Sequence, residues 1–138
     1  MTGDCIFCAI ASGEAEAEIV HADDDSVAFL DFRPLFHGHT LLIPRAHHET
    51  LADLPEELVG CLFLRARRLS VAVRDAVGAE GSFVAVNNRV SQSVPHLHVH
   101  IVPRVKGDGL RGFFWPRHKY SGAELSETGE LIRAQLRR

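Results

Sequence analysis

The pattern of apolar and polar positions along the chain predicts an α+β fold. The strongest helical signal begins after Pro55, where apolar residues recur every three or four positions as far as Val77. Asp53 and Glu56 suit a capping box at its start, and Gly78 suits its end. Clusters of β-branched and aromatic residues between turn signals predict strands at residues 18–21, 26–32, 39–44, 82–87 and 96–102.

Two further helices are expected, one over residues 5–11 and one from about Ser121 to the basic C-terminus, where Glu124 completes a capping box. The strands come in a run with one long helix between them, which favours an antiparallel sheet. No repeat or linker divides the 138 residues, so we expect a single domain over residues 1–138.

The composition is that of a soluble globular protein, with 46% hydrophobic and 24% charged residues. A net charge of −3 does not favour binding to nucleic acid or to a membrane surface. No apolar run has the length of a membrane span, and the N-terminus lacks a secretion signal, so a cytoplasmic location is expected. A basic stretch at residues 104–119 is either a solvated loop or a positively charged region that attracts an anionic substrate.

The most informative segment is residues 95–103, in which three histidines alternate with aliphatic residues. Alternate residues of a strand share a face, so His96, His98 and His100 are expected on one side and the aliphatic residues on the other. The aliphatic side suits a core. Imidazoles are costly to bury without polar partners, so the histidine side should line a cleft. There each ring is suited to act as a nucleophile, an acid or base, or a metal ligand.

The residues alone leave three interpretations of this face. The first is one metal ion on all three histidines, but same-face neighbours lie about 6.6 Å apart and zinc–nitrogen bonds measure about 2.0–2.1 Å. The second divides the work: one histidine joins Cys5, Cys8 and another histidine around a structural metal, one is a nucleophile, and one donates a proton or hydrogen bond. The third is anion binding without a reaction.

The cysteines bear on this choice. In a reducing compartment Cys5 and Cys8 suit a metal or redox pair better than a disulfide. Cys61 is expected as a buried thiol within the long helix. The polar residues before the histidine strand, Asn87, Asn88 and residues 91–94, supply groups that bind phosphoryl oxygens. Attack of a neutral imidazole on phosphorus would split one displacement into two.

Residues 96–102 resemble the signature of the histidine triad (HIT) superfamily, in which three histidines alternate with apolar residues. Further likenesses to the family are found at residues 29–31, 39–47 and 92–94, and Cys5-Ile6-Phe7-Cys8 is similar to the start of many bacterial members. The resemblance covers about residues 4–104, which leaves 105–138 as a C-terminal loop and helix. It implies a five-stranded antiparallel sheet, usually paired with that of a second copy in a homodimer.

The resemblance also implies a nucleotide hydrolase or nucleotidyl transferase that acts at the α-phosphate. His98 would form a nucleotidyl-histidine, and His100 would contact the phosphate and assist the leaving group. The phosphate-contacting positions of the family correspond to Asn87, Gln92 and Ser93. Asp31 corresponds to the residue that binds the ribose hydroxyls in the family. The base pocket corresponds to four apolar residues, which core packing would also explain: Ile6, Phe7, Phe29 and Phe32.

Zinc-containing relatives, including galactose-1-phosphate uridylyltransferases, imply a structural zinc ion bound by four residues: Cys5, Cys8, His47 and His96. Strand alternation turns the adjacent His48 away, and His37 and His39 flank a glycine turn with a structural role. The sequence departs from the family at Ser91, which replaces a glycine, in a loop that looks short. Either Asn87 or Asn88 could therefore meet the phosphate.

His100 stands where the uridylyltransferases have glutamine, which favours hydrolase-type members. The expected function is hydrolysis of a nucleoside phosphoramidate or dinucleoside polyphosphate. The alternatives are a nucleotide-binding regulatory protein with little turnover and a nucleotidyl transferase or phosphorylase.

Overall fold

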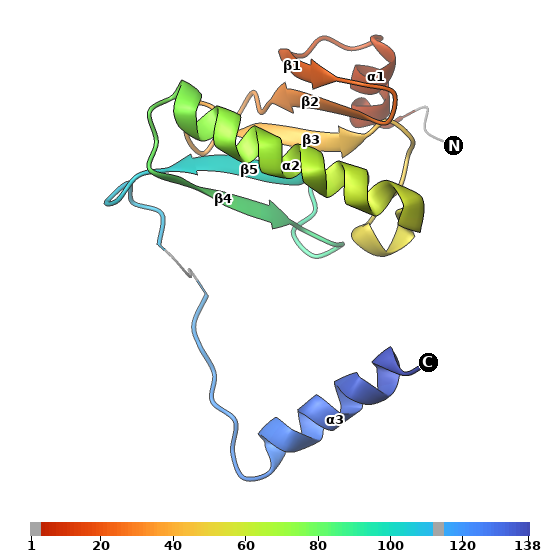
Figure 1. The fold of residues 1–138 in the computed structure, drawn as a ribbon, viewed down its shortest axis with the longest axis vertical. Helices are drawn as coiled ribbons and strands as arrows, with labels where there is room; N and C mark the ends of the chain where they lie inside the picture. Colours follow the sequence, from red (N-terminus) through yellow and green to blue (C-terminus); the bar gives the residue numbers. More distant parts are fainter. Residues whose placement is uncertain (1–3, 112–114) are drawn as a thin grey trace. The chain divides into compact units, whose positions relative to one another are not determined.

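The computed structural model describes residues 4–111 and 115–138, and the chain forms two units, residues 1–108 and 109–138. The first unit is built on one five-stranded antiparallel sheet with the strand order β1-β2-β3-β5-β4 (Figure 1). The strands are β1 (Ile19–Ala22), β2 (Ser26–Leu30), β3 (Thr40–Pro44), β4 (Gly81–Val86) and β5 (Val99–Arg104). The predicted α+β architecture is confirmed.

The long helix α2 (Glu56–Ala76) packs on one face of the sheet. Side chains from β2, β3 and β5 pack against its apolar stripe in one core cluster, which includes Leu42, Val99, Ile101, Leu62 and Ala66. Burial of each Leu, Ile or Val side chain stabilises the fold by about 1.5–3 kcal/mol. This face therefore contains the aliphatic residues that alternate with the histidines.

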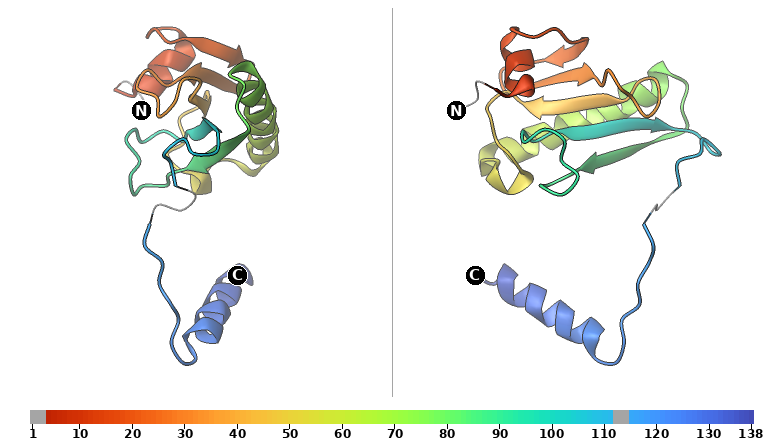
Figure 2. Two further views of the ribbon diagram at one scale, coloured as in Figure 1. Left: turned by 90° about the vertical axis from the view of Figure 1, so that its left-hand side faces the viewer. Right: turned by 180° about the vertical axis from the view of Figure 1, so that it is seen from behind.

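The short helix α1 (Ile6–Ser12) packs on the opposite face, as Figure 2 shows from the side. Its Phe7 and Ile10 join the alternate residues of β2 and β3, Phe29 and Leu41 among them, in a second core cluster. The helix ends at Gly13, whose φ of +85° is a left-handed conformation that favours glycine. Because Leu41 pairs with His100 across β3 and β5, the histidines face α1.

Two expected boundaries are corrected. Strand β5 begins at Val99, so His96 and His98 precede it in an irregular segment, although the Leu97 N–H still donates to the His48 carbonyl at 2.7 Å. Asp53 does not cap α2. It forms a capping box with Thr50 around a short 3-10 helix, η1 (Leu51–Asp53), because that turn intervenes before α2 begins.

The second unit contains α3 (Glu124–Leu136), which has no buried residue. Half of its expected capping box is present, since the Ser121 N–H donates to the Glu124 carboxylate at 2.6 Å. Among the described residues, no helix is both long enough and apolar enough to cross a membrane.

Candidate functional site

The four residues expected to bind metal come together at the N-terminal end of α1. Sγ of Cys8 lies 3.3 Å from Nδ1 of His47 and 3.4 Å from Nδ1 of His96, and Sγ of Cys5 also lies 3.4 Å from the latter atom. All four ligand atoms lie within 4.8 Å of one another. In a tetrahedral site with bonds of about 2.0–2.3 Å, neighbouring ligand atoms stand about 3.3–3.8 Å apart. The cluster therefore has the donors and the spacing to hold a metal ion.

The surroundings of His96 orient its ring for this role. Nε2 lies 2.8 Å from the carbonyl oxygen of Pro44. A carbonyl only accepts, so Nε2 carries the proton and Nδ1 presents its lone pair to the sulfurs. A backbone carbonyl behind a ligating histidine is a common outer partner in metal sites. Burial lowers the pKa of His96 to about 4, although the bond to Pro44 opposes the shift, so the ring is neutral and able to bind metal near pH 7.

Arg45 fixes the helix that contributes the two cysteines. Its guanidinium donates to the carbonyl of Ala11 at 2.8 Å, in the last turn of α1, and to that of Asp23 at 2.6 Å. At the other end, Sγ of Cys5 accepts from the N–H of Cys8 at 3.4 Å. The C-terminal end of α1 is thus held to the β1–β2 turn by Arg45, and Cys5 caps its N-terminal end.

His98 is oriented by the chain just before it. Its Nδ1 lies 2.8 Å from the carbonyl oxygen of His96, so Nδ1 carries the proton and Nε2 keeps its lone pair. Phe7 and this ring pack in a T-shaped arrangement, with centroids 5.0 Å apart. An imidazole held in one tautomer with a free Nε2 has the form of a nucleophile.

His100 has a different partner, which sequence reasoning did not find. Its Nδ1 lies 3.0 Å from Nε2 of His39, a residue directly before the neighbouring strand β3 that is only 3% exposed. Burial lowers the pKa of His100 to about 4, with smaller contributions from His98 and His39. His39 was expected only as a structural residue beside Gly38. The signal available in the sequence was the family-like segment at residues 39–47, which begins at His39.

A cleft of about 830 Å³ opens in front of His98 and His100. Sites for small ligands commonly measure about 300–1,000 Å³. Of the four apolar residues expected in a base pocket, Phe7 and Phe29 are buried in the core, whereas Ile6 is 49% and Phe32 is 91% exposed. All four line the cleft. Core packing explains the first two residues but leaves the exposure of the other two unexplained.

The carboxylate of Asp31 lines the same cleft. Its Oδ1 accepts from the N–H of Arg33 at 3.0 Å, and Oδ2 lies 3.8 Å from Nε2 of His39. The side chain is 20% exposed. One carboxylate oxygen is therefore held by the backbone while the group remains accessible from the cleft.

Of the residues expected to contact phosphate, some line the cleft and others are hydrogen-bonded to the chain itself. Ser93 lines the cleft. The Gln92 side chain is bonded to the chain itself, since it donates to the carbonyl of Glu49 at 2.7 Å and accepts from the N–H of Arg89 at 2.8 Å. Asn88 accepts from the N–H of Leu51 at 2.8 Å. Gln92 and Asn88 thus fix the loop, whereas Asn87 is not among the residues that line the cleft.

The same loop has two residues in left-handed backbone conformations, Arg89 with φ of +69° and Ser91 with φ of +63°. Such conformations cost a residue other than glycine about 1–3 kcal/mol. Ser91 is the position where the family usually has glycine. The backbone conformation is thus one that suits glycine, even though the side chain differs.

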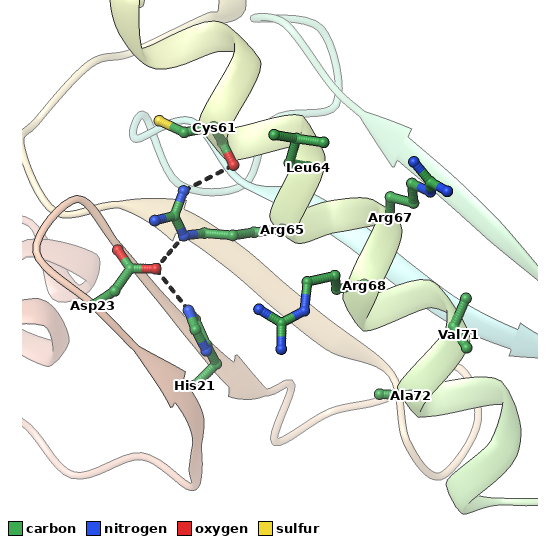
Figure 3. Close-up of a pocket in the computed structure, with 9 residues that line it drawn as sticks. All are labelled: His21, Asp23, Cys61, Leu64, Arg65, Arg67, Arg68, Val71 and Ala72. Carbon is green, nitrogen blue, oxygen red and sulfur yellow. Dashed lines mark hydrogen bonds and ion pairs between the residues drawn. The ribbon is translucent and has the colours of Figure 1, made fainter.

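A second hollow of about 900 Å³ lies away from the histidine triad, between α2 and β1 (Figure 3). In it Arg65 pairs with Asp23, donates to the Cys61 carbonyl at 2.9 Å, and so links α2 to the β1–β2 turn. Cys61, expected as a buried thiol, is half-buried there. Burial raises the pKa of Asp23, but hydrogen bonds from His21, the Asp25 and Ser26 amides and Arg65 outweigh it and hold that pKa well below its usual range. This network is structural.

Residues 12–107 match the HIT domain family, and the chain belongs to that family. An uncharacterised HIT-like protein of Methanocaldococcus jannaschii is 41% identical over 107 residues, which cover 76% of this chain and 82% of that protein. The adenosine 5′-monophosphoramidase of Schizosaccharomyces pombe is 32% identical, covering 96% and 98% of the two chains. An adenylylsulfatase of Arabidopsis thaliana is 36% identical, covering 80% of this chain and 57% of that protein. Relatives of this chain thus include hydrolases.

Solved structures agree with this assignment. A protein of Streptococcus mutans superposes with a TM-score of 0.90 at 31% identity, over 99% of this chain and 87% of that chain. A zinc-bound histidine triad family protein of Mycobacterium smegmatis superposes with a TM-score of 0.75 at 36% identity, over 97% and 94% of the two chains.

Proposed function

We infer that this protein is a nucleotide hydrolase that acts at the α-phosphate of a nucleoside phosphoramidate or a dinucleoside polyphosphate, through a nucleotidyl-histidine on His98. The observation that carries this proposal is the 2.8 Å contact between Nδ1 of His98 and the His96 carbonyl. It leaves the Nε2 lone pair available at a cleft of ligand size. The hydrolases among the relatives support the reaction class.

The chemistry runs in two displacements. In the first, Nε2 of His98 attacks the α-phosphorus, a P–N bond forms, and the bond to the leaving group breaks, so that the leaving group departs with the electron pair and takes a proton from solvent. In the second, water attacks the same phosphorus, the P–N bond breaks with its electron pair returning to Nε2, and the proton that the water loses passes to solvent. Because Nδ1 donates to a backbone carbonyl throughout, the positive charge on the substituted ring is stabilised without a proton leaving it.

The remaining residues of the site bind the nucleotide. His100, Ser93 and Asn87 are assigned to the phosphate oxygens, with Gln92 holding their loop in shape. Asp31 is assigned to the ribose hydroxyls, for which a carboxylate is a suitable acceptor. The exposed Ile6 and Phe32 are assigned to the faces of the base, with Phe7 and Phe29 as the floor beneath them.

We further propose zinc as the metal held by Cys5, Cys8, His47 and His96. Two thiolates and two imidazoles are a common tetrahedral zinc set, and the zinc-bound relative supports the choice. When bound, zinc would supply structure, because closed four-ligand sites leave no position for a substrate. It would fasten α1, and hence Ile6 and Phe7 of the cleft, to the segment that contains His96.

A homodimer with paired sheets is also proposed. Strand β4 is an outer strand of the sheet, and its Val84 is 43% exposed. An unpaired strand edge is a template for pairing with another chain. Light scattering on the purified protein would measure the mass, and a monomer across the usable concentration range would contradict this part of the proposal.

The function is tested by incubating the protein with adenosine and guanosine phosphoramidates and dinucleoside polyphosphates, followed by acid-free mass spectrometry for a nucleotidyl adduct. We expect turnover and an adduct on His98, both abolished in His98→Ala and retained in His21→Asn, a histidine outside the cleft. Tight nucleotide binding without turnover or adduct would instead favour the regulatory alternative. If phosphate or an added alcohol releases the nucleotide from the adduct faster than water does, a phosphorylase or a transferase is favoured.

A further inference from the structure

A short series of hydrogen bonds runs from the backbone to the ring of His100. The N–H of Leu35 donates to Nδ1 of His39 at 3.1 Å. A backbone amide can only donate, so Nδ1 of His39 is an acceptor and the proton of this neutral ring is on Nε2. Nε2 lies 3.0 Å from Nδ1 of His100. It therefore donates, Nδ1 of His100 accepts, and the proton of His100 is on Nε2.

The opposite assignment is not compatible with these contacts. If His100 donated from Nδ1, then Nε2 of His39 would have to accept and its proton would move to Nδ1, against the N–H of Leu35. A cationic His100 would meet the same obstacle, since both of its nitrogens would be donors. The Asp31 carboxylate lies 3.8 Å from Nε2 of His39, which is too far to take the hydrogen bond in place of His100.

The same atoms could also be considered as metal ligands, because Asp31, His39 and His100 each place one ligand atom within 4.8 Å of the others. The 3.0 Å separation of the two imidazole nitrogens is the length of a direct hydrogen bond. One of these nitrogens therefore carries a proton, which a metal ligand does not. The group is a hydrogen-bonded one.

The consequence is a difference between two neighbouring histidines of the triad. His98 and His100 have ring centroids 4.9 Å apart and both line the cleft. The His96 carbonyl leaves His98 with a lone pair on Nε2, whereas His39 leaves His100 with an N–H there. One ring is prepared to attack phosphorus and the other to donate to an anionic phosphate oxygen.

We propose that His39 is a positioning residue that holds His100 as the neutral Nε2–H tautomer, so that His100 meets the α-phosphate as a hydrogen-bond donor. The inference rests on the proposed function for its ligand, a nucleotide. His100 keeps its proton, so no proton transfer is involved. In the other tautomer, a lone pair would face a negatively charged oxygen and repel it.

The first test reads the tautomer directly and needs no activity. In long-range ¹H–¹⁵N spectra the protonated and unprotonated nitrogens of an imidazole have well-separated shifts. We expect His39 and His100 as Nε2–H forms and His98 as the Nδ1–H form near pH 7. In His39→Leu, the His100 signals should show a second tautomer or exchange broadening. In His39→Gln, whose amide can both accept from Leu35 and donate to His100, the single form should return.

The second test measures binding of AMP and of adenosine to the same variants. A hydrogen bond to a charged group is worth about 10- to 100-fold in affinity. His39→Leu should weaken AMP at least 10-fold, change adenosine less than 2-fold, and leave the circular dichroism spectrum unchanged. His39→Gln should restore most of the AMP affinity. A structural role would weaken both ligands together and would not distinguish the two variants.

An Nδ1–H form of His100 in the wild type, an unchanged tautomer in His39→Leu, or equal losses for AMP and adenosine would each overturn the inference. Failure of the proposed function looks different. If the wild type neither binds AMP nor turns over any nucleotide, the proposed ligand is wrong, while the tautomer spectra still decide whether His39 sets the form of His100.

Discussion

Nδ1 of His47 lies 3.3 Å from Sγ of Cys8, although 39 positions separate the two residues. The contact joins α1 to the segment after β3, and a bound metal would fix that join. We expect about one zinc per chain by elemental analysis. Cys8→Ser and His47→Ala should remove the metal and lower the melting temperature, because metal binding contributes to folding stability. The matched controls are Cys61→Ser and His48→Ala, which should retain the metal. Equal metal content in all four variants would contradict the assignment.

Phe29 and Phe32 are three positions apart but should respond oppositely to truncation. Phe29 is 3% exposed and Phe32 is 91% exposed. Phe29→Ala should lower the unfolding free energy by about 3–5 kcal/mol, whereas Phe32→Ala should change it by less than about 0.5 kcal/mol. If Phe32 contacts the base, Phe32→Ala should raise KM several-fold with little change in kcat. Urea unfolding and steady-state kinetics measure the two effects. An unchanged KM would remove Phe32 from the base pocket.

The ribose assignment of Asp31 is tested with paired substrates. A 2′,3′-dideoxy analogue would leave the carboxylate without its partners, at a cost of about 1–3 kcal/mol, or about 5- to 150-fold in kcat/KM. Asp31→Asn keeps an acceptor for the N–H of Arg33 but loses the charge, so it should lose most of the discrimination between the two substrates. If the variant discriminates as well as the wild type, another residue binds the ribose. Glu16 and Glu18 also line the cleft, but among the described residues they form no three-ligand metal-binding group with Asp31. Activity should therefore also survive a mild magnesium chelator that spares zinc.

The left-handed conformation of Ser91 predicts a stabilising substitution. Ser91→Gly removes the strain, and although glycine makes the unfolded chain more flexible, the unfolding free energy should rise by about 0.5–1 kcal/mol. Ser93, in the same loop, is not among the described residues with a positive φ. Ser93→Gly should therefore lower stability slightly. Thermal and urea unfolding of both variants provide the comparison, and destabilisation by Ser91→Gly would show that its side chain has a compensating contact.

The lowered pKa of Asp23 predicts how stability responds to acid. A carboxyl whose pKa is lower in the folded state stabilises the protein fully above its unfolded pKa, near 3.9, and this contribution is lost as pH falls from there toward the folded pKa. With 22% of the side chain exposed, solvent screening limits the expected effect to about 1–2 kcal/mol. Asp23→Asn should be destabilised by that amount at pH 7 and pH 5, and the difference should shrink at pH 3. The exposed neighbour provides the control, since Asp24→Asn should match the wild type throughout.

Much of the fold follows from local patterns. The alternation around His98 and the helical period between Leu58 and Val73 are each sufficient to assign an element, because side-chain direction repeats every second residue in a strand and about every 3.6 residues in a helix. The same alternation placed the histidines on the face opposite the aliphatic residues. The ends of the strands and helices could not be predicted exactly from local patterns. Strand β5 begins at Val99 because pairing with β3 and β4 sets its length, and that pairing is not a local property.

The residue types of the candidate site were also readable from the sequence, since few other arrangements combine a Cys-x-x-Cys pair with three alternating histidines. The different role of each histidine could not be predicted from the sequence. Which nitrogen of each imidazole carries the proton is decided by hydrogen-bond partners that the motifs do not assign: the carbonyl of Pro44 for His96, the carbonyl of His96 for His98, and the ring of His39 for His100. Likewise, only folding shows that Phe29 is covered and Phe32 exposed. The sequence determines the chemical groups and their local spacing, and the tertiary structure determines their hydrogen-bond partners and burial, because both depend on contacts between segments far apart in the chain.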